Sequence, residues 1–264
     1  DIPAYGYGIR YNHGIFNQQL RNGWQTEQPD NWLRHGNPWE IPREDLIFSV
    51  GYGGEVKVIR EGARDRFKWI TADQVHGIAY DTPIVGYGGK TINTLRLWSA
   101  KATEEFNFQE FNDGDYVEAV RSKILAENLS QVLYPNDTLY MGKELRLKQQ
   151  YFFVACSLAD IVRRFKRQSA PWSRFPDFVA IQLNDTHPSL AIPEMMRILL
   201  DEENLDWDEA WTITTAMMGY TNHTRMHEAL ERWPLPMLKS ILPRHLQIIY
   251  EINQRFLQHA VAFF

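Results

Sequence analysis

The stretch Phe178–Ala191, FVAIQLNDTHPSLA, indicates how this chain folds. Its first part, Phe178–Leu183, is a short apolar run without turn residues, which is typical of a buried strand in a parallel sheet. The stretch Pro188–Leu200 is amphipathic and starts with Pro-Ser, which indicates a helix. A strand that leads directly into a helix is half of a βαβ unit, so this stretch predicts a parallel α/β layer.

Patterns on either side of this stretch continue the alternation. Trp211–Met217 is rich in Thr and Ile and predicts a second central strand. Leu242–Phe263 predicts a final helix with Pro243 in its first turn. Upstream, apolar residues recur at helical spacing in Asp115–Ser130 and Gly142–Phe165, which predicts two further helices.

The first hundred residues have a different pattern, rich in Gly, Trp and Tyr. Short apolar runs predict strands at Asp45–Val50, Glu55–Ile59, Arg66–Ile70, His76–Tyr80 and Thr91–Trp98. Gly51-Tyr52-Gly53-Gly54 predicts a hairpin turn between the first two, and Gly86-Tyr87-Gly88-Gly89 separates the last two. The predicted class is therefore α/β, with an antiparallel β-rich part over residues 1–100 and a helical, parallel α/β part over residues 101–264.

Composition excludes several classes of function. The 264 residues carry a formal net charge of -5 and are 44% hydrophobic, so no basic excess indicates a nucleic acid or an anionic membrane as partner. No apolar stretch is long enough to span a bilayer. The single cysteine, Cys156, excludes a disulfide within the chain and favours a reducing compartment. Because the sequence starts Asp1-Ile2-Pro3 and ends in an apolar run, we interpret it as an internal segment.

Two polar loops follow the predicted strands of the α/β part. Asn184–Pro188 and Tyr220–Thr224 both carry many hydrogen-bonding side chains and little net charge. Ligands of open α/β sheets bind beyond the carboxyl ends of strands, and sugars need surfaces of this kind. The alternative is that Asp185 or Asn222 caps the following helix and that the histidines pack locally.

A third polar segment, Leu133–Tyr140, connects two predicted helices. Its Pro, Asn and Asp residues are typical of a turn. It is either a plain connector or a gate over a cleft, and the pattern alone does not separate the two.

Long strings of this sequence resemble one protein family. Ala180–Ala191, AIQLNDTHPSLA, and Tyr220–Thr224, YTNHT, are similar to the α-glucan (glycogen and maltodextrin) phosphorylases. Further strings match that family in order: Tyr5–Tyr11, Gly36–Glu40, Asn128–Ser130, Val132–Asp137, Gly142–Gln149, Glu228–Pro234 and Leu242–Asn253. The resemblance covers essentially the whole chain and is that of an internal segment of the N-terminal domain of a bacterial-type member.

The resemblance implies an activity and a cofactor. Family members have a two-domain GT-B fold and use inorganic phosphate to release glucose 1-phosphate from α-1,4-glucans such as glycogen or maltodextrin. Pyridoxal 5′-phosphate is the implied cofactor, a cytoplasmic homodimer the implied assembly, and allosteric control is common in the family. The cofactor lysine lies in a C-terminal domain that this sequence lacks, so we expect the segment to be inactive alone.

The resemblance also implies site residues on the sugar side. His223 is the expected catalytic residue, whose side chain and backbone carbonyl would favour positive charge developing at the anomeric carbon. The expected substrate-binding residues are Tyr134, Asn136, Asp137, Thr138, Arg146, Asp185, His187, Asn222 and Thr224. Among them, Arg146 is expected to pair with Asp185, and Asn136, Asp137 and Thr138 to form the gate.

The basic pair Arg163 and Arg164 matches residues that bind the phosphate of an activating nucleotide in animal members of the family. From the residues alone, the pair is a solvated end of a helix, where cations complement the helix dipole.

Two other classes of function remain open at this level. His223 and His227 are four residues apart with Glu228 next, as in some metal-dependent hydrolases, but the Glu does not lie between the histidines as the zinc-protease motif requires. A non-catalytic glucan-binding or oligomerisation module is the second alternative.

Overall fold

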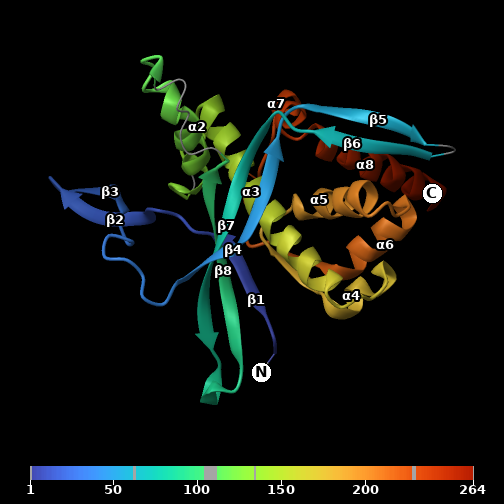
Figure 1. Cartoon of the computed structure of the whole chain (residues 1–264), viewed down its shortest axis with the longest axis horizontal. Coiled ribbons are helices and arrows are strands. Elements are labelled where there is room, and N and C mark those ends of the chain that lie inside the picture. Colours follow the sequence, from blue (N-terminus) through green and yellow to red (C-terminus); the bar gives the residue numbers. More distant parts are fainter. Residues whose placement is uncertain (1, 62–63, 104–111, 134, 228–229, 264) are drawn as a thin grey trace. The chain divides into compact units, whose positions relative to one another are not determined.

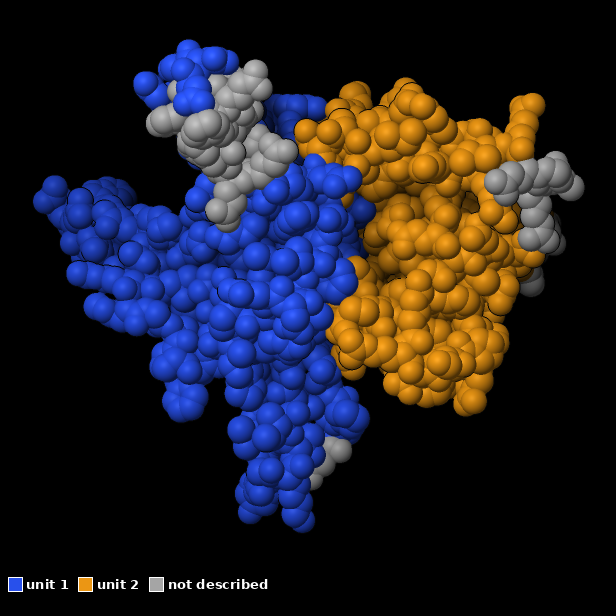
Figure 2. Space-filling model, viewed as in Figure 1, with its two compact units in different colours: residues 1–50, 74–156 blue, residues 51–73, 157–264 orange. Residues whose placement is uncertain are grey.

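The computed structural model describes residues 2–61, 64–103, 112–133, 135–227 and 230–263. The chain forms two compact units that are interleaved in sequence (Figure 2). Unit 1 consists of Asp1–Val50 and Gln74–Cys156, and unit 2 of Gly51–Asp73 and Ser157–Phe264.

Unit 1 is built on a four-stranded sheet in the order β1-β8-β7-β4 (Figure 1). Its strands are β1 (Tyr5–Ile9), β4 (Ile41–Tyr52), β7 (Asp73–Val85) and β8 (Ile92–Ala102). β7 and β8 form an antiparallel hairpin through the short helix η1 (Tyr87–Gly89), as the second glycine cluster predicted. β1 pairs parallel to β8. A separate antiparallel hairpin joins β2 (Gly14–Arg21) to β3 (Trp24–Asp30).

The helices of unit 1 follow the predicted spacing. They are α2 (Glu118–Glu127), the 3-10 turn η2 (Asn128–Ser130) and α3 (Tyr140–Lys166), of which residues 157–166 belong to unit 2. α3 packs on the sheet through a close approach between Gly77 of β7 and Cys156, which is fully buried. Cys156 is therefore a small core residue, as its apolar surroundings predicted.

Adding a methyl group at Gly77 should destabilise unit 1. A Cβ built at Gly77 would lie 2.3 Å from Sγ of Cys156 and 3.2 Å from Phe152, so Gly77→Ala forces the helix and sheet apart. We expect a loss of about 1–3 kcal/mol in the free energy of unfolding, measured by urea denaturation. Introducing Cys156→Ala into the same variant removes the nearest atom and should recover part of the loss; no recovery would contradict this account of the contact.

Unit 2 contains one hairpin, one parallel strand pair and most of the helices. The hairpin joins β5 (Glu55–Glu61) to β6 (Arg64–Ile70), and the parallel pair is β9 (Ile181–Asn184) with β10 (Met218–Thr221). The helices are η3 (Trp172–Arg174), α4 (Phe175–Phe178), α5 (Ala191–Arg197), the π-helical turn η4 (Ile198–Glu202), α6 (Trp207–Met217), α7 (Leu235–Ile241) and α8 (Pro243–Phe263). The predicted class, α/β with an antiparallel first part and a parallel second part, is confirmed.

The prediction of a strand at Trp211–Met217 is wrong, because this segment lies in helix α6. Its buried residues, Ala210, Ile213, Thr214 and Met217, follow helical spacing, with one face turned to the core. Asp208 and Glu209 in the first turn favour a helix start. The central strand is β10, which begins directly after α6.

Two smaller predictions also need correction. Gly51–Gly54 does not close a hairpin, because β4 pairs with β7 whereas β5 pairs with β6. Gly53 and Gly54 instead turn the chain from one sheet to the other with positive φ angles of 63° and 78°. The strand expected at Phe178–Leu183 begins later, at Ile181, because α4 extends through Phe178.

Buried charges join α5 to α8 within unit 2. Glu194 and His245 are 2% and 0% exposed, and Nε2 of His245 lies 2.6 Å from Oε2 of Glu194. Arg197 donates to both oxygens of the same carboxylate, at 2.7 and 2.8 Å. Next to this cluster, Arg244 donates two hydrogen bonds of 2.7 Å to Asp201 of η4.

The Glu194 carboxylate is ionised in this network. Burial opposes ionisation, but the charge of Arg197 and hydrogen bonds from Arg197 and His245 outweigh it and lower the pKa of Glu194 to about 2. Burial also lowers the pKa of His245 below its ordinary value of 6.5, against the opposing effect of Glu194. A neutral imidazole therefore donates its Nε2–H to a carboxylate.

The β5–β6 hairpin covers these charges with two aromatic rings. The ring centroid of Phe67 lies 4.1 Å from the guanidinium carbon of Arg244. Trp69 meets the His245 ring edge-on at 5.3 Å and donates its Nε1–H to the carbonyl of Gly53. The start of α8 is thus held by a hydrogen bond to α5, an ion pair to η4 and aromatic contacts with β6.

Candidate functional site

The two polar loops predicted from the sequence lie side by side in unit 2. β9 and β10 are parallel, with Asn184 opposite Thr221 at their carboxyl ends. The backbone N–H of Asp185 donates to the carbonyl of Thr221 at 2.9 Å, which extends the pairing by one residue. The two polar segments therefore meet at one edge of this strand pair, and Tyr220 and Thr221 belong to the strand itself.

The side chains of the two loops meet at His223. Nε2 of His223 lies 2.5 Å from Oδ1 of Asn184, and both residues are exposed. One step back along the strands, Gln182 donates its side-chain N–H to Oγ1 of Thr221 at 2.8 Å. Gln182 is thus bonded to the last residue of β10, and Asn184 to the loop that follows it.

Asp185 does not cap a helix, so that alternative is wrong for this residue. α5 starts six residues later and has Leu190, without a side-chain bond, at its N-cap. Asp185 has a positive φ of 66°, and its Oδ1 accepts from the backbone N–H of Thr186 at 2.8 Å. This left-handed conformation is uncommon for a residue with a side chain and directs the loop sharply away from the strand. His187 follows at a half-buried position.

Asn222 and Thr224 fix the second loop by local turns. Oδ1 of Asn222 accepts from the N–H of Thr224 at 3.0 Å, and Oγ1 of Thr224 accepts from the N–H of Met226 at 3.2 Å. These bonds are an Asx turn and its threonine counterpart, not a helix cap. They hold the backbone on both sides of His223.

The expected gate residues lie in unit 1 and fold back on the start of α3. Oδ1 of Asn136 accepts from the N–H of Thr138 at 2.9 Å, and Arg146 forms an ion pair with Asp137. A Cβ at Gly142 would come within 1.8 Å of the Asn136 carbonyl oxygen, so only glycine permits this approach. Tyr134 lies outside the described residues.

The predicted pairing of Arg146 with Asp185 joins residues of different units and stays a prediction. The same holds for the gating role of Asn136, Asp137 and Thr138. The acidic partner that the structure shows for Arg146 is the carboxylate of Asp137.

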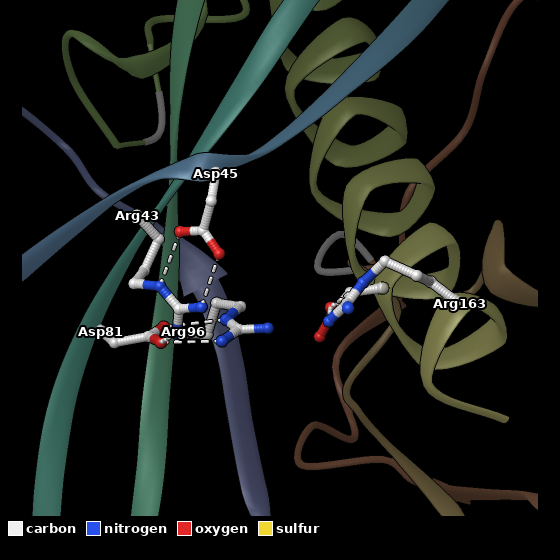
Figure 3. A network of polar contacts seen from close by, with 6 residues as sticks. Arg43, Asp45, Asp81, Arg96 and Arg163 are labelled. Atoms are coloured by element: carbon white, nitrogen blue, oxygen red, sulfur yellow. Dashed lines mark hydrogen bonds and ion pairs between the residues drawn. The ribbon is translucent and has the colours of Figure 1, made fainter. Parts of the chain in front are cut away.

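Charged side chains that sequence reasoning did not identify gather on the sheet of unit 1 (Figure 3). Asp81 and Arg96 face each other on β7 and β8, and Arg96 donates to both oxygens of the carboxylate at 2.8 and 2.7 Å. Arg43 of β4 donates to Asp81 at 3.1 Å and, through two bonds, to Asp45. The register of β7 and β8 brings Asp81 and Arg96 together, and no local sequence motif indicates this pairing.

Arg163 and Arg164 lie in the last turns of α3, as expected for cations at a helix C-terminus. Arg163 donates to Oδ1 of the buried Asp160, one turn earlier, at 2.7 Å. The regulatory role of the pair stays a prediction.

Within the described part of the chain, His, Cys, Asp and Glu side chains form no group of three that could hold a metal ion. Glu228, which the metal hypothesis invoked beside His223 and His227, lies outside the described residues. No helix in the described ranges is long and apolar enough to cross a membrane.

The chain belongs to the carbohydrate phosphorylase family, whose sequence model it matches over residues 1–264. It is 55% identical to the muscle form and 56% identical to the brain form of human glycogen phosphorylase, over 271 aligned residues in each case. It is 54% identical to the liver form from sheep. Each alignment covers the whole chain but only 31–32% of the relative, so the chain spans about a third of the length of these relatives. The resemblance stated from the sequence strings is thus confirmed at the level of the family.

Proposed function

We propose that the protein carrying this chain is an α-1,4-glucan phosphorylase, which uses inorganic phosphate to release glucose 1-phosphate from glycogen or maltodextrin. The observation that carries the proposal is the meeting of Asn184 and His223 at the carboxyl ends of β9 and β10. It occurs in a chain that is 54–56% identical to glycogen phosphorylases. The relatives' names and the family supply the reaction, and the loops supply a place for the sugar.

In this proposal, unit 2 forms the sugar-side wall of the active site. Asp185, His187, Asn222 and Thr224 line the glucosyl position, with donors and acceptors that match sugar hydroxyls. His223 contacts the reacting sugar and favours positive charge developing at the anomeric carbon through both its side chain and its backbone carbonyl. Tyr134, Asn136, Asp137 and Thr138 act as the gate, and Arg146 orients Asp185.

Pyridoxal 5′-phosphate is the expected cofactor, but the two loops do not fit it. Binding through its aldehyde requires a lysine, and neither residues 184–188 nor residues 220–224 contain one. We propose that the cofactor and most phosphate-binding residues belong to parts of the protein outside this chain, as the family resemblance implies. We likewise propose a cytoplasmic homodimer as the full-length assembly, with Arg163 and Arg164 as a nucleotide-phosphate site.

We expect the 264-residue chain to release no glucose 1-phosphate by itself, because it supplies sugar contacts without a cofactor lysine. A coupled assay with maltoheptaose and phosphate measures this, and the longer protein serves as the positive control. Turnover by the chain alone would show that its own residues suffice for the chemistry.

A non-catalytic glucan-binding module is the second candidate, since the chain spans only a third of its relatives. If the longer protein binds maltoheptaose by calorimetry but gives no glucose 1-phosphate, this second candidate replaces the first.

A further inference from the structure

The bond between Asn184 and His223 determines where the imidazole carries its proton. Nε2 of His223 lies 2.5 Å from Oδ1 of Asn184. An amide oxygen accepts hydrogen bonds but cannot donate one, so Nε2 must carry the hydrogen. In the neutral ring, Nδ1 is then the acceptor.

We propose that Asn184 is a positioning residue for His223, whose amide oxygen holds the imidazole in the Nε2–H tautomer and leaves Nδ1 as an acceptor for a sugar hydroxyl. The sugar contact rests on the proposed function. The tautomer does not, because it follows from the contact between the two side chains.

The backbone around this pair supports a fixed geometry. Asn184 is the last residue of β9, held opposite Thr221 by the parallel pairing. The bond from the Asp185 N–H to the Thr221 carbonyl prevents the two strand ends from separating beyond that point. On the other strand, the Asx turn from Asn222 to Thr224 encloses His223. The backbone positions of Asn184 and His223 are therefore both fixed by neighbouring hydrogen bonds.

The tautomer of His223 matters because the protonation of Nδ1 determines whether a ligand must donate to it or accept from it. A neutral ring with Nε2–H presents a lone pair at Nδ1, whereas the opposite tautomer would present an N–H there. Protonation would make both nitrogens donors and remove the acceptor. Because both side chains are exposed, the ring remains accessible to a sugar while its tautomer is set from the β9 side.

Histidine-selective ¹⁵N spectra of the whole chain test the tautomer directly. We expect His223, identified by the signal lost in His223→Gln, to show a protonated Nε2 and an unprotonated Nδ1. In Asn184→Ala the ring should populate both tautomers. In Asn184→Asp the carboxylate should still accept the Nε2–H, so the ring should keep the Nε2–H tautomer.

Gln182→Ala is the matched control, since it removes the neighbouring cross-strand bond to Thr221 and leaves Asn184 in place. Its His223 signals should match those of the unmodified chain. The proposal is overturned if His223 is protonated at Nδ1 instead, or if Asn184→Ala leaves the His223 signals unchanged.

Kinetics in the longer protein separate this proposal from the proposed function. Asn184→Ala should lower kcat/KM about tenfold, and Asn184→Asp, which keeps an oxygen acceptor for the Nε2–H, should lose less. If His223→Ala abolishes activity while Asn184→Ala has no effect on rate or spectrum, the function stands and the positioning role is wrong. If the tautomer is pinned but His223→Ala retains full activity, the sugar role of His223 is wrong and the tautomer assignment stands.

Discussion

Glu194→Ala should lower the free energy of unfolding of the chain by about 3–5 kcal/mol, a large share of the stability of an ordinary domain. The substitution leaves Arg197 without its bidentate carboxylate partner and His245 without the acceptor of its Nε2–H, in a region where both partners are shielded from water. Removing one member of a buried ionic cluster costs the desolvation of those that remain. Urea denaturation, extrapolated linearly to zero denaturant, measures the effect.

Glu251→Ala provides a matched control in the same unit. Glu251 and Arg255 are also 2.6 Å apart, but their side chains are 40% and 45% exposed. Exposed pairs contribute about 0–1 kcal/mol, so this variant should be close to the unmodified chain. If Glu194→Ala and Glu251→Ala lowered the free energy of unfolding equally, burial would not be the reason for the effect at Glu194.

Acid titration gives a second check on the same variant. Glu194 has a pKa of about 2 when folded and an ordinary value of 4.5, so the unfolded chain binds the proton first as the pH falls. His245 also has a lowered pKa, so its contribution declines as the pH falls below 6.5. Both groups stabilise the fold at neutral pH and lose that effect toward acid. Glu194→Ala should therefore show a weaker loss of stability between pH 4.5 and 2 than the unmodified chain.

His223→Ala should reduce kcat/KM of the longer protein by on the order of 100- to 1,000-fold, or about 3–4 kcal/mol of transition-state stabilisation. The expected loss falls mainly on kcat, because the substitution removes the proposed imidazole contact, which strengthens as charge develops at the anomeric carbon, and keeps the backbone carbonyl. Initial rates of glucose 1-phosphate release over a range of maltoheptaose concentrations separate kcat from KM.

His227→Ala is the companion variant, because His227 is an exposed histidine only four residues further along. It should keep rates near those of the unmodified protein. Near-normal kcat/KM in His223→Ala, or an equal loss in His227→Ala, would show that the catalytic assignment is wrong.

The sequence predicted elements well where local periodicity and burial agree. α3 and α8 have long apolar faces at helical spacing, and both were expected within two residues of their observed starts. The prediction of a strand at Trp211–Met217 was wrong because Thr and Ile favour strands. In the structure, buried positions at helical spacing and acidic residues in the first turn favour a helix. The prediction of a hairpin at Gly51–Gly54 was wrong because a run of glycines shows where the chain turns. It does not show whether the strands on either side of the turn pair with each other.

Site residues were predicted best where they lie within a few residues of a strand end. The parallel order of β9 and β10 brought the two loops together, which the alternation of strands and helices had already indicated. The contact from Asn184 to His223 and the pairs from Arg96 to Asp81 and from Glu194 to His245 depend on register and helix packing between distant segments. A single sequence carries no local signal of such contacts.

The aromatic rings that cover Arg244 and His245 are synthesised well before the residues that they cover. Phe67 and Trp69 are synthesised long before α8, and at about 5–20 residues per second the gap lasts roughly 10–40 s. Until then a two-stranded hairpin, which is marginally stable in water by itself, exposes these rings to solvent without their final partners. The apolar face of the β5–β6 hairpin therefore gains its final partners only late in synthesis, after α8 has been made.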